Sequence, residues 1–257
     1  MDKVIEMEPM LTEPSGDLLV LEFQKDDAGE HGDVRDIVAK RDVEHWEFGL
    51  SIKHNHDAVK HSRLSYKLDF GNEWYHQPCS SEYWNDIEPI FNHLKTEKKR
   101  GTKWSELKDK DLSVYVPILN AFIKEISRAY ENDEELPCKM IEYLIGIEDY
   151  YKIVSHDEQR LTLIHTFNIH GTLNKSSKIQ VSAITVPVVN LPTELVALKF
   201  KKESTNTVEA YFNNGWQLSF RIHNASTIVE PSLKFDIQFM GMPTSILNIQ
   251  CQWNKED

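Results

Sequence analysis

Alternating apolar and polar positions near the N-terminus predict three short β-strands. Apolar runs cover Leu18–Gln24, Val34–Lys40 and Trp46–Asn55, and short polar segments separate them. A turn is predicted at Gly29–Gly32, because glycines mark changes of chain direction. The short links between the runs predict an antiparallel meander.

Helical periodicity follows in the middle of the chain. Ser80–His93 starts with two serines and an early acid, which favours a helix start. Pro117–Tyr130 carries apolar residues every four positions, and Pro137–Ile147 is a further helix candidate. Each helix has an apolar face to bury against a sheet.

The last hundred residues change to a β pattern. The predicted strands are Leu161–Ile169, Ile179–Val189, Leu195–Lys201, Thr207–Phe212, Gln217–His223 and Leu233–Met240. Asn213-Asn214-Gly215 predicts a hairpin, since Asn and Gly tolerate positive φ. The whole predicts one α/β domain of the α+β mixed type, with a central mixed sheet, flanking helices and a β-rich C-terminal half.

Composition excludes several classes of protein. The 257 residues are 40% hydrophobic and 27% charged, which is typical of a globular chain. Apolar runs are too short for a membrane span, and no secretory signal is visible. The three cysteines are widely spaced, which argues against a disulfide framework or a cysteine zinc site and fits the cytoplasm.

The net charge of −12 argues against a protein that coats nucleic acid, but the charge is unevenly distributed. Lys53–Lys67 holds four basic residues, one acidic residue and three histidines. Lys95–Lys110 holds seven basic and three acidic residues. A local basic surface that binds a polyanion is therefore compatible with the acidic total, as are two solvated charged faces.

Asp36 at the start of one predicted strand and Lys53 near the end of the next suggest metal-dependent phosphodiester hydrolysis. Neighbouring strands lie about 5 Å apart, so the two side chains can meet. Carboxylate oxygens bind Mg²⁺, the ion lowers the pKa of an attacking water, and a lysine offsets charge on the phosphate. Asp and Lys near strand ends are also common without any such role.

The second metal-binding carboxylate is left open. Ser51, two residues before the lysine, stands where such sites usually have an acid. Glu47 lies about 20 Å from Lys53 along the strand unless a bulge at Gly49 shortens the path. Asp57, Asp33 and a residue outside this strand pair remain candidates.

The surrounding sequence resembles the HaeIII family of type II restriction endonucleases. The resemblance lies in Gly32–Asp36, Lys53–Ser65, Leu68–Gly71 and Trp74, and Trp216–Phe239. It implies a PD-(D/E)xK nuclease core over about 16–150 and a β-rich DNA-recognition part over about 157–253. It also implies an enzyme that cuts double-stranded DNA at a short palindrome, with GGCC expected, and that uses Mg²⁺. Asp36 matches the motif aspartate, with Asp33 as its substitute, and Lys53 matches the motif lysine.

DNA contacts are predicted in two segments. Donors close to the metal site suit the phosphate backbone: His54, Asn55, His56, Lys60, His61, Ser62 and Arg63. The late strands supply candidates for reading bases: Arg221, His223, Asn224, Ser226 and Lys234. Asp236 is a candidate acceptor for cytosine. Asn168 and His170 are added because Phe167–Gly171 repeats the pattern of Phe220–Asn224.

A palindromic site implies a homodimer or successive cuts by a monomer. The family resemblance also implies a cognate DNA methyltransferase that protects host DNA. Relatives usually carry a helix before the first strand, and this chain begins almost at that strand. If the helix is missing, we expect impaired metal binding or a true start that lies upstream. The alternatives are a catalytically impaired or truncated DNA-binding protein of the same fold, and a β-rich interaction domain unrelated to DNA.

Overall fold

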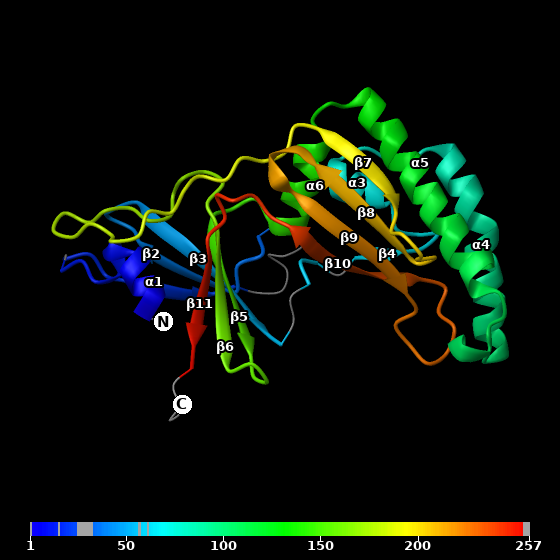
Figure 1. Cartoon of the computed structure of the whole chain (residues 1–257), viewed down its shortest axis with the longest axis horizontal. Helices are drawn as coiled ribbons and strands as arrows, with labels where there is room; N and C mark the ends of the chain where they lie inside the picture. The colour runs from blue at the N-terminus through cyan, green and yellow to red at the C-terminus, as the bar shows by residue number, and fades with distance from the viewer. Residues whose placement is uncertain (1, 15, 25–32, 56–57, 61, 254–257) are drawn as a thin grey trace. The chain divides into compact units, whose positions relative to one another are not determined.

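The computed structural model describes residues 2–14, 16–24, 33–55, 58–60 and 62–253 (Figure 1). The chain forms two compact units, each assembled from separate stretches of sequence. The first comprises Met1–Asp57, Gly146–Leu191 and Pro243–Asp257, and the second comprises Ala58–Ile145 and Pro192–Met242. The predicted single domain, with a core and a recognition part, stays a prediction.

The first unit contains a mixed sheet that has six strands among the described residues. Its elements are α1 (Asp2–Met7), the 3-10 helix η1 (Pro9–Leu11), β1 (Val20–Phe23), β2 (Ile37–Arg41), β3 (Trp46–His54), β5 (Tyr150–His156), β6 (Leu161–Phe167) and β11 (Asn248–Gln252). The strand order is β1-β2-β3-β5-β6-β11, in which β3 and β5 are parallel and the other neighbours antiparallel. The predicted meander of the first three strands is confirmed.

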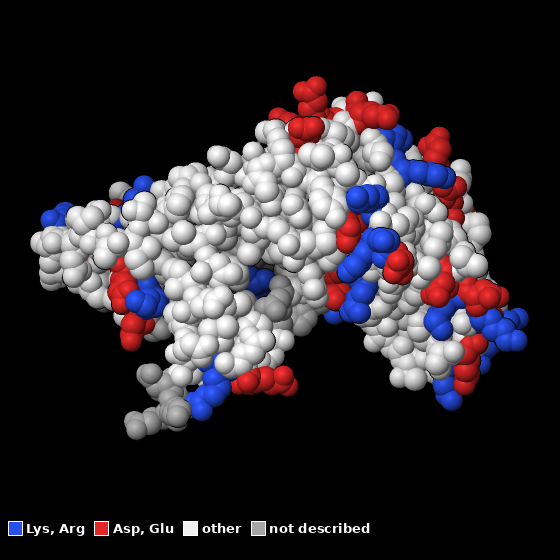
Figure 2. Space-filling view, viewed as in Figure 1, with Lys and Arg blue, Asp and Glu red and all other residues white. Residues whose placement is uncertain are grey.

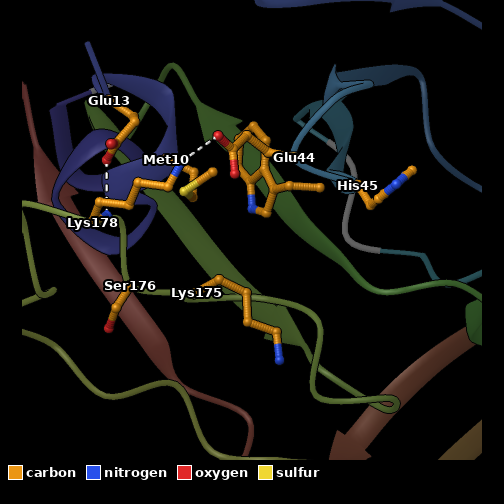
Figure 3. A pocket seen from close by; sticks show the side chains of 8 residues that line it. Met10, Glu13, Glu44, His45, Lys175, Ser176 and Lys178 are labelled. Atoms are coloured by element: carbon orange, nitrogen blue, oxygen red, sulfur yellow. Dashed lines mark hydrogen bonds and ion pairs between the residues drawn. The ribbon is translucent and has the colours of Figure 1, made fainter. Parts of the chain in front are cut away.

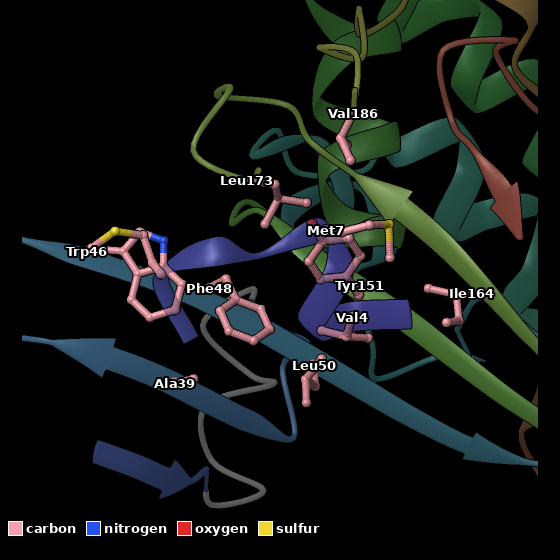
Figure 4. Packing of buried hydrophobic residues seen from close by; sticks show 11 residues of the cluster. Val4, Met7, Ala39, Trp46, Phe48, Leu50, Tyr151, Ile164, Leu173 and Val186 are labelled. Carbon is pink, nitrogen blue, oxygen red and sulfur yellow. The ribbon is translucent and has the colours of Figure 1, made fainter. Parts of the chain in front are cut away.

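One face of this sheet packs against α1. Because side chains alternate along a strand, Phe48 and Leu50 of β3 lie on the same face. Val4 and Met7 of α1 belong to the same buried cluster, as Figure 4 shows. A short helix therefore precedes β1 among the described residues, and its two apolar residues are buried in this core.

The predicted strand over Ile179–Val189 is wrong. Ile184 and Val186 pack against the core of the first unit, whereas Ile179, Val181 and Val188 are exposed. The segment has no strand pairing within the described residues. Asn174 holds the segment instead: it donates from Nδ2 to the Ile184 carbonyl at 3.0 Å and accepts from Val186 N at 3.2 Å. Burial without a neighbouring strand produces the same apolar pattern as a strand does.

The second unit contains an antiparallel sheet and the longer helices. Its elements are β4 (Arg63–Leu64), α3 (Phe70–Tyr75), α4 (Ser81–Arg100), the 3-10 helix η2 (Trp104–Glu106), the π-helix η3 (Asp111–Tyr115), α5 (Val116–Asn132), α6 (Leu136–Ile145), β7 (Leu195–Phe200), β8 (Thr207–Phe212), the 3-10 turn η4 (Asn213–Gly215), β9 (Gln217–His223) and β10 (Leu233–Gly241). The strand order is β4-β10-β9-β8-β7.

Aromatic residues join the helices to one face of this sheet. Trp74 of α3 stacks on Phe220 of β9 with ring centroids 5.9 Å apart. Phe122 of α5 lies 5.2 Å from Phe235 of β10. These four rings are buried, and burial of each large side chain contributes about 1.5–3 kcal/mol. The opposite face of the sheet is therefore left to polar residues.

The three predicted helices of this unit are confirmed, with shifted ends. The Ser80 hydroxyl accepts from Tyr83 N at 3.1 Å and so caps α4. The same helix continues through the basic residues to Arg100, and Gly101, at φ 73°, ends it. Basic side chains in the last turn favourably oppose the helix dipole. The predicted hairpin is confirmed as well, since Asn214 and Gly215 have positive φ between β8 and β9.

The mixed α/β class is confirmed. Helices α3 to α6 belong to the second unit, whereas the mixed sheet of the first unit is packed by α1 and irregular chain. None of the helices in the described residues combines the length and apolar character needed to cross a membrane.

Candidate active site

Asp36 and Lys53 meet on one face of the mixed sheet. The Lys53 Nζ lies 3.1 Å from Asp36 Oδ2 and 3.5 Å from Asp36 Oδ1. Asp36 immediately precedes β2, and Lys53 is the penultimate residue of the neighbouring β3. The predicted encounter of the acid and the lysine across two strands is present in the structure.

The backbone holds the Asp36 carboxylate in place. The Ile52 N–H donates to Asp36 Oδ2 at 2.5 Å, and the Asp36 N–H donates to the Leu50 carbonyl at 2.7 Å. The second of these bonds continues the β2–β3 ladder by one residue beyond the strand. Asp36 is therefore rigidly placed by neighbouring backbone.

The pair is open to solvent. The side chain of Lys53 is 36% exposed and that of Asp36 is 45% exposed. An ion pair with this exposure adds little to stability, since water competes with both charges. Its accessibility leaves both groups available to a bound ligand.

Ser51 lies between these residues and a lysine that sequence reasoning missed. Ser51 pairs with Lys152 of β5, and Lys152 pairs with His165 of β6. Paired residues share a face, so these three side chains lie on the face that carries Lys53. The signal for β5 was the run Tyr150–Val154, rich in aromatic and β-branched residues, with one lysine in its middle.

Asp33 has a different partner. Arg35 donates from Nε to Asp33 Oδ1 and from Nη2 to Asp33 Oδ2, both at 2.8 Å. Its Nη1 donates to Glu47 Oε1 at 2.8 Å. Both oxygens of Asp33 are thus engaged, which makes Asp36 the better metal-ligand candidate of the two.

Glu47 is not brought to Lys53. The β2–β3 register runs continuously past Gly49, so the bulge that would shorten the path is not formed. Instead, the Arg35 side chain crosses the strand at Gly49, where a Cβ atom would lie 2.0 Å from Arg35 Cδ. Glycine at this position gives the arginine its path to Glu47.

Tyr150 is a buried neighbour of the pair. Burial raises the pKa of its phenol well above the usual value, and the Asp36 charge raises it further. Tyr150 stacks on Phe167 with ring centroids 4.9 Å apart. The phenol therefore stays neutral beside the carboxylate.

The predicted phosphate-binding segment is only partly described. Asp57, His56 and His61 lie outside the described residues. His54 Nε2 lies 2.7 Å from Asp157 Oδ2, and the Asn55 amide donates to the same oxygen at 3.1 Å. These bonds tie the end of β3 to the turn after β5.

Lys60 and Ser62 point toward protein. The Lys60 ammonium donates to the Tyr143 carbonyl at 3.0 Å and lies 3.6 Å from the centroid of the Tyr143 ring. Burial lowers the pKa of Lys60 to about 8, despite the opposing charge of Glu73. Ser62 is buried, and its carbonyl accepts from Phe235 N. The Lys60 ammonium is thus directed at Tyr143, and the Ser62 hydroxyl is buried.

Arg63, by contrast, belongs to a basic row on the polar face of the second unit's sheet. Lys234 of β10 pairs with Arg63 of β4 on one side and with His223 of β9 on the other. One step along the same strands, Arg221 pairs with Asp236. Four residues predicted from sequence as DNA contacts, Arg63, Arg221, His223 and Lys234, are thereby collected on one surface.

The remaining candidates build loops. The Asn224 amide donates to the carbonyls of Ser226 and Ile228, and its oxygen accepts from Glu230 N. The Ser226 hydroxyl accepts from Ile228 N at 3.3 Å. The two side chains shape the β9–β10 connection.

The polar residues of the first segment of the echo, Asn168 and His170, bond to the surrounding backbone. Asn168 is buried and donates to the Val186 carbonyl. His170 follows the end of β6 and its Nε2 donates to the Ile147 carbonyl at 2.7 Å. Both residues stabilise the irregular segment after β6.

A pocket of about 330 Å³ lies elsewhere in the first unit, and none of the predicted site residues lines it (Figure 3). Met10 and Trp46 contribute apolar surface. Lys178 spans it, with its Nζ 2.7 Å from Glu44 Oε1 and its N–H donating to Glu13. The Lys178–Glu44 ion pair occupies part of the lining, and nothing in the lining singles out a ligand.

Comparisons with known proteins agree with the geometry. A family model described as HaeIII restriction endonuclease matches residues 1–243. The chain is 49% identical over 253 residues to the type II restriction enzyme HaeIII of Haemophilus aegyptius, a match that covers 98% of this chain and 79% of the relative. No solved structure matches the chain. The chain therefore belongs to the HaeIII restriction endonuclease family and is an enzyme of the site-specific deoxyribonuclease class.

Proposed function

We propose that this enzyme hydrolyses phosphodiester bonds of double-stranded DNA at a short palindrome, with Mg²⁺ as its cofactor. The observation that carries the proposal is the solvent-open contact between Asp36 and Lys53. GGCC is the first sequence to test, because the family resemblance implies it. DNA is also the substrate implied by the name of the relative at 49% identity.

The carboxylate of Asp36 is a ligand type that suits Mg²⁺. Within the described part of the chain, no three His, Cys, Asp or Glu side chains are grouped to hold a metal. Mg²⁺ needs fewer protein ligands, because it keeps several waters and binds one or two carboxylates plus substrate phosphate. Asp36 supplies one carboxylate. Candidates for a second are Asp57, which lies outside the described residues, and a residue outside this strand pair.

The chain's own groups then divide the work. Asp36 would hold the ion, and Ile52 N–H keeps its carboxylate oriented. The Lys53 ammonium, placed beside that carboxylate, offsets negative charge on the substrate phosphate. When bound, Mg²⁺ lowers the pKa of the attacking water and polarises the phosphate. Ser51 is 3% exposed and neutral, so it adds no charge.

For DNA binding, we assign backbone contacts to the basic row of Arg63, Lys234 and His223. Arg63 reaches Ser232 Oγ at 3.3 Å and is otherwise exposed. His54 and Asn55 are secondary candidates, since Asp157 holds both side chains. His56 and His61 stay predictions.

The proposed setting is a restriction–modification system in the cytoplasm. A cognate methyltransferase would protect host DNA. Two copies related by a two-fold axis would cut both strands of a palindrome in one encounter. Analytical ultracentrifugation with and without a GGCC duplex tests this assembly, and a monomer under both conditions would favour successive cuts.

The activity is tested by incubating plasmid DNA with the protein and Mg²⁺. Discrete fragments are expected from the parent, and Asp36→Ala and Lys53→Ala should lose them. The matched control is Lys40→Ala, because Lys40 also makes an ion pair across two strands of this sheet, 2.6 Å from Glu22. If Lys40→Ala also loses the fragments, the effect comes from removing any positive charge from this sheet and not from the Asp36–Lys53 site.

The same assay separates the alternative function. A protein that shifts a duplex in a gel but never nicks it would be the catalytically impaired DNA-binding protein. Asp57→Asn should abolish cleavage while leaving duplex binding in place, if Asp57 is the second ligand. Full cleavage by Asp57→Asn would move that ligand to another residue.

A further inference from the structure

The antiparallel sheet of the second unit presents a polar face that no described element of that unit covers. Phe220 and Phe235 point to the helices, so their strand neighbours point the other way. Strands β8, β9 and β10 face the viewer in Figure 1, and Figure 2 shows basic and acidic side chains interspersed over the same area.

Arg221 and Asp236 are directly opposite each other on this face. The Arg221 Nη2 donates to Asp236 Oδ2 at 2.9 Å. The Arg221 side chain is 54% exposed, whereas that of Asp236 is only 13% exposed. The carboxylate thus lies at the base of the pair and the guanidinium stands above it.

A neighbouring residue reinforces the carboxylate. The Gln238 amide donates to the same Asp236 Oδ2 at 3.4 Å, from two positions along β10. Among the described residues, the Arg221 guanidinium has this single recorded hydrogen-bond acceptor. A guanidinium has five N–H donors, so most of the Arg221 donors remain available to a ligand.

The chemistry of the face changes along the strands. On one side of the Arg221–Asp236 pair lies the basic row of Arg63, Lys234 and His223. On the other side Ser219 pairs with Gln238, two neutral hydrogen-bonding residues. A basic row suits phosphate, and an arginine beside neutral polar groups suits a base edge.

We propose that Arg221 reads a guanine of the recognition site and that Asp236 is the residue that positions it. This inference rests on the proposed function, since it assigns a specificity element to the same DNA substrate. Arginine is the common bidentate partner of guanine O6 and N7. An arginine already oriented by a carboxylate loses less side-chain freedom on binding.

The Asp236 carboxylate is expected to affect non-specific DNA binding and base discrimination in opposite directions. It repels phosphate, so Asp236→Asn should strengthen binding to non-specific DNA while weakening discrimination. A residue with only a structural role would not separate these two quantities. Glu209→Gln is the matched control, since Glu209 is a carboxylate on the same face, bonded to the Tyr211 hydroxyl.

The experiment has two readouts. Cleavage of a random-sequence duplex library by the full chain, followed by sequencing of the ends, gives the base preference at each position. Equilibrium binding to a GGCC duplex and to duplexes with one G·C pair replaced, in EDTA, gives discrimination without cleavage. Arg221→Ala should reduce discrimination at one G·C pair by roughly 10- to 100-fold, and Asp236→Asn by a smaller factor at the same pair.

Two results overturn the inference, and they are distinguishable. If the parent cuts DNA and both variants keep its base preference, the Arg221–Asp236 pair is only a surface ion pair. The proposed function would then still stand. A folded parent that neither binds nor cuts any duplex would remove the proposed function and this inference together. Thermal melting of every variant confirms that a changed preference is not a loss of fold.

Discussion

The carboxyl group of Glu8 accepts a hydrogen bond of 2.6 Å from the Tyr151 hydroxyl inside the first unit. Glu8 is fully buried, and Asn174 N donates to the same oxygen at 2.6 Å. Burial raises the pKa of Glu8 from 4.5 to about 7, although these hydrogen bonds act in the opposite direction. The contact ties the N-terminal segment to β5, the strand beside Lys53.

The burial of Glu8 predicts a pH-dependent stability. The folded protein keeps a proton on Glu8 up to about pH 7, whereas the unfolded chain releases it near pH 4.5, so the free energy of unfolding falls as pH rises between these values. Glu8→Gln removes the titration. We expect the free energy of unfolding of the variant to exceed that of the parent by up to about 3 kcal/mol at pH 8. Near pH 4 we expect the two proteins to be equally stable.

Urea unfolding at the two pH values measures this difference. Glu6→Gln is the control, because Glu6 is exposed and pairs with Lys3. An equal gain at pH 4 and pH 8 would show that Glu8 is not the titrating group.

Lys60 predicts a pH dependence of the opposite sign. Burial lowers its folded pKa to about 8 from 10.5, so between these values the unfolded chain binds more protons and stability rises with pH. We expect Lys60→Met to be more stable than the parent by roughly 1–2 kcal/mol at pH 7. The gain is limited because the variant loses the cation–π contact. Above about pH 10 the difference in stability between variant and parent should disappear.

The same variant tests the DNA role first predicted for Lys60. Because its ammonium faces Tyr143, duplex affinity should change by less than about twofold. Lys67→Met, at an exposed position of the same segment, is the control for a changed net charge. A steep loss of affinity in Lys60→Met alone would mean that this lysine turns toward DNA.

Gly49→Ala should destabilise the first unit. The new Cβ would meet Arg35 Cδ at 2.0 Å, and Asp33 and Glu47 both hold that arginine in place. We expect a loss of about 1–3 kcal/mol in thermal or urea unfolding. Gly16→Ala is the control, because no heavy atom lies within 4 Å of the added Cβ. Unchanged stability in Gly49→Ala would show that Arg35 can leave its ion pairs at little cost.

Ser51 offers a gain-of-function test. Ser51→Asp places a carboxylate where such nuclease sites usually have one, on the strand pair of Asp36 and Lys53. We expect half-maximal cleavage at an about tenfold lower Mg²⁺ concentration, because a second carboxylate strengthens binding of the ion. Ser51→Ala should cut like the parent, and calorimetric titration of Mg²⁺ checks binding without catalysis. A folded Ser51→Ala without activity would assign a role to the hydroxyl.

Part of the fold could be predicted from sequence because the signals were local. The spacing of apolar residues and the signals at the helix ends were enough to predict α4 and α5. Asn213–Gly215 was enough to predict the hairpin. Caps and turns depend on nearby residues, so a local sequence specifies them. Alternation along β2 and β3 likewise sufficed to bring Asp36 close to Lys53. Asp36 immediately precedes β2 and Lys53 lies on β3, and a short link joins these two strands.

What only the tertiary structure decided was long-range pairing. Lys152 joins the face of Ser51 because β5, a hundred residues away, pairs in parallel with β3. Asp236 lies under Arg221 because the β9–β10 register places them opposite each other. Sequence alone specifies which residues prefer burial and where the chain turns. Which strands become neighbours, and so which polar side chains share a face, depends on packing between distant segments.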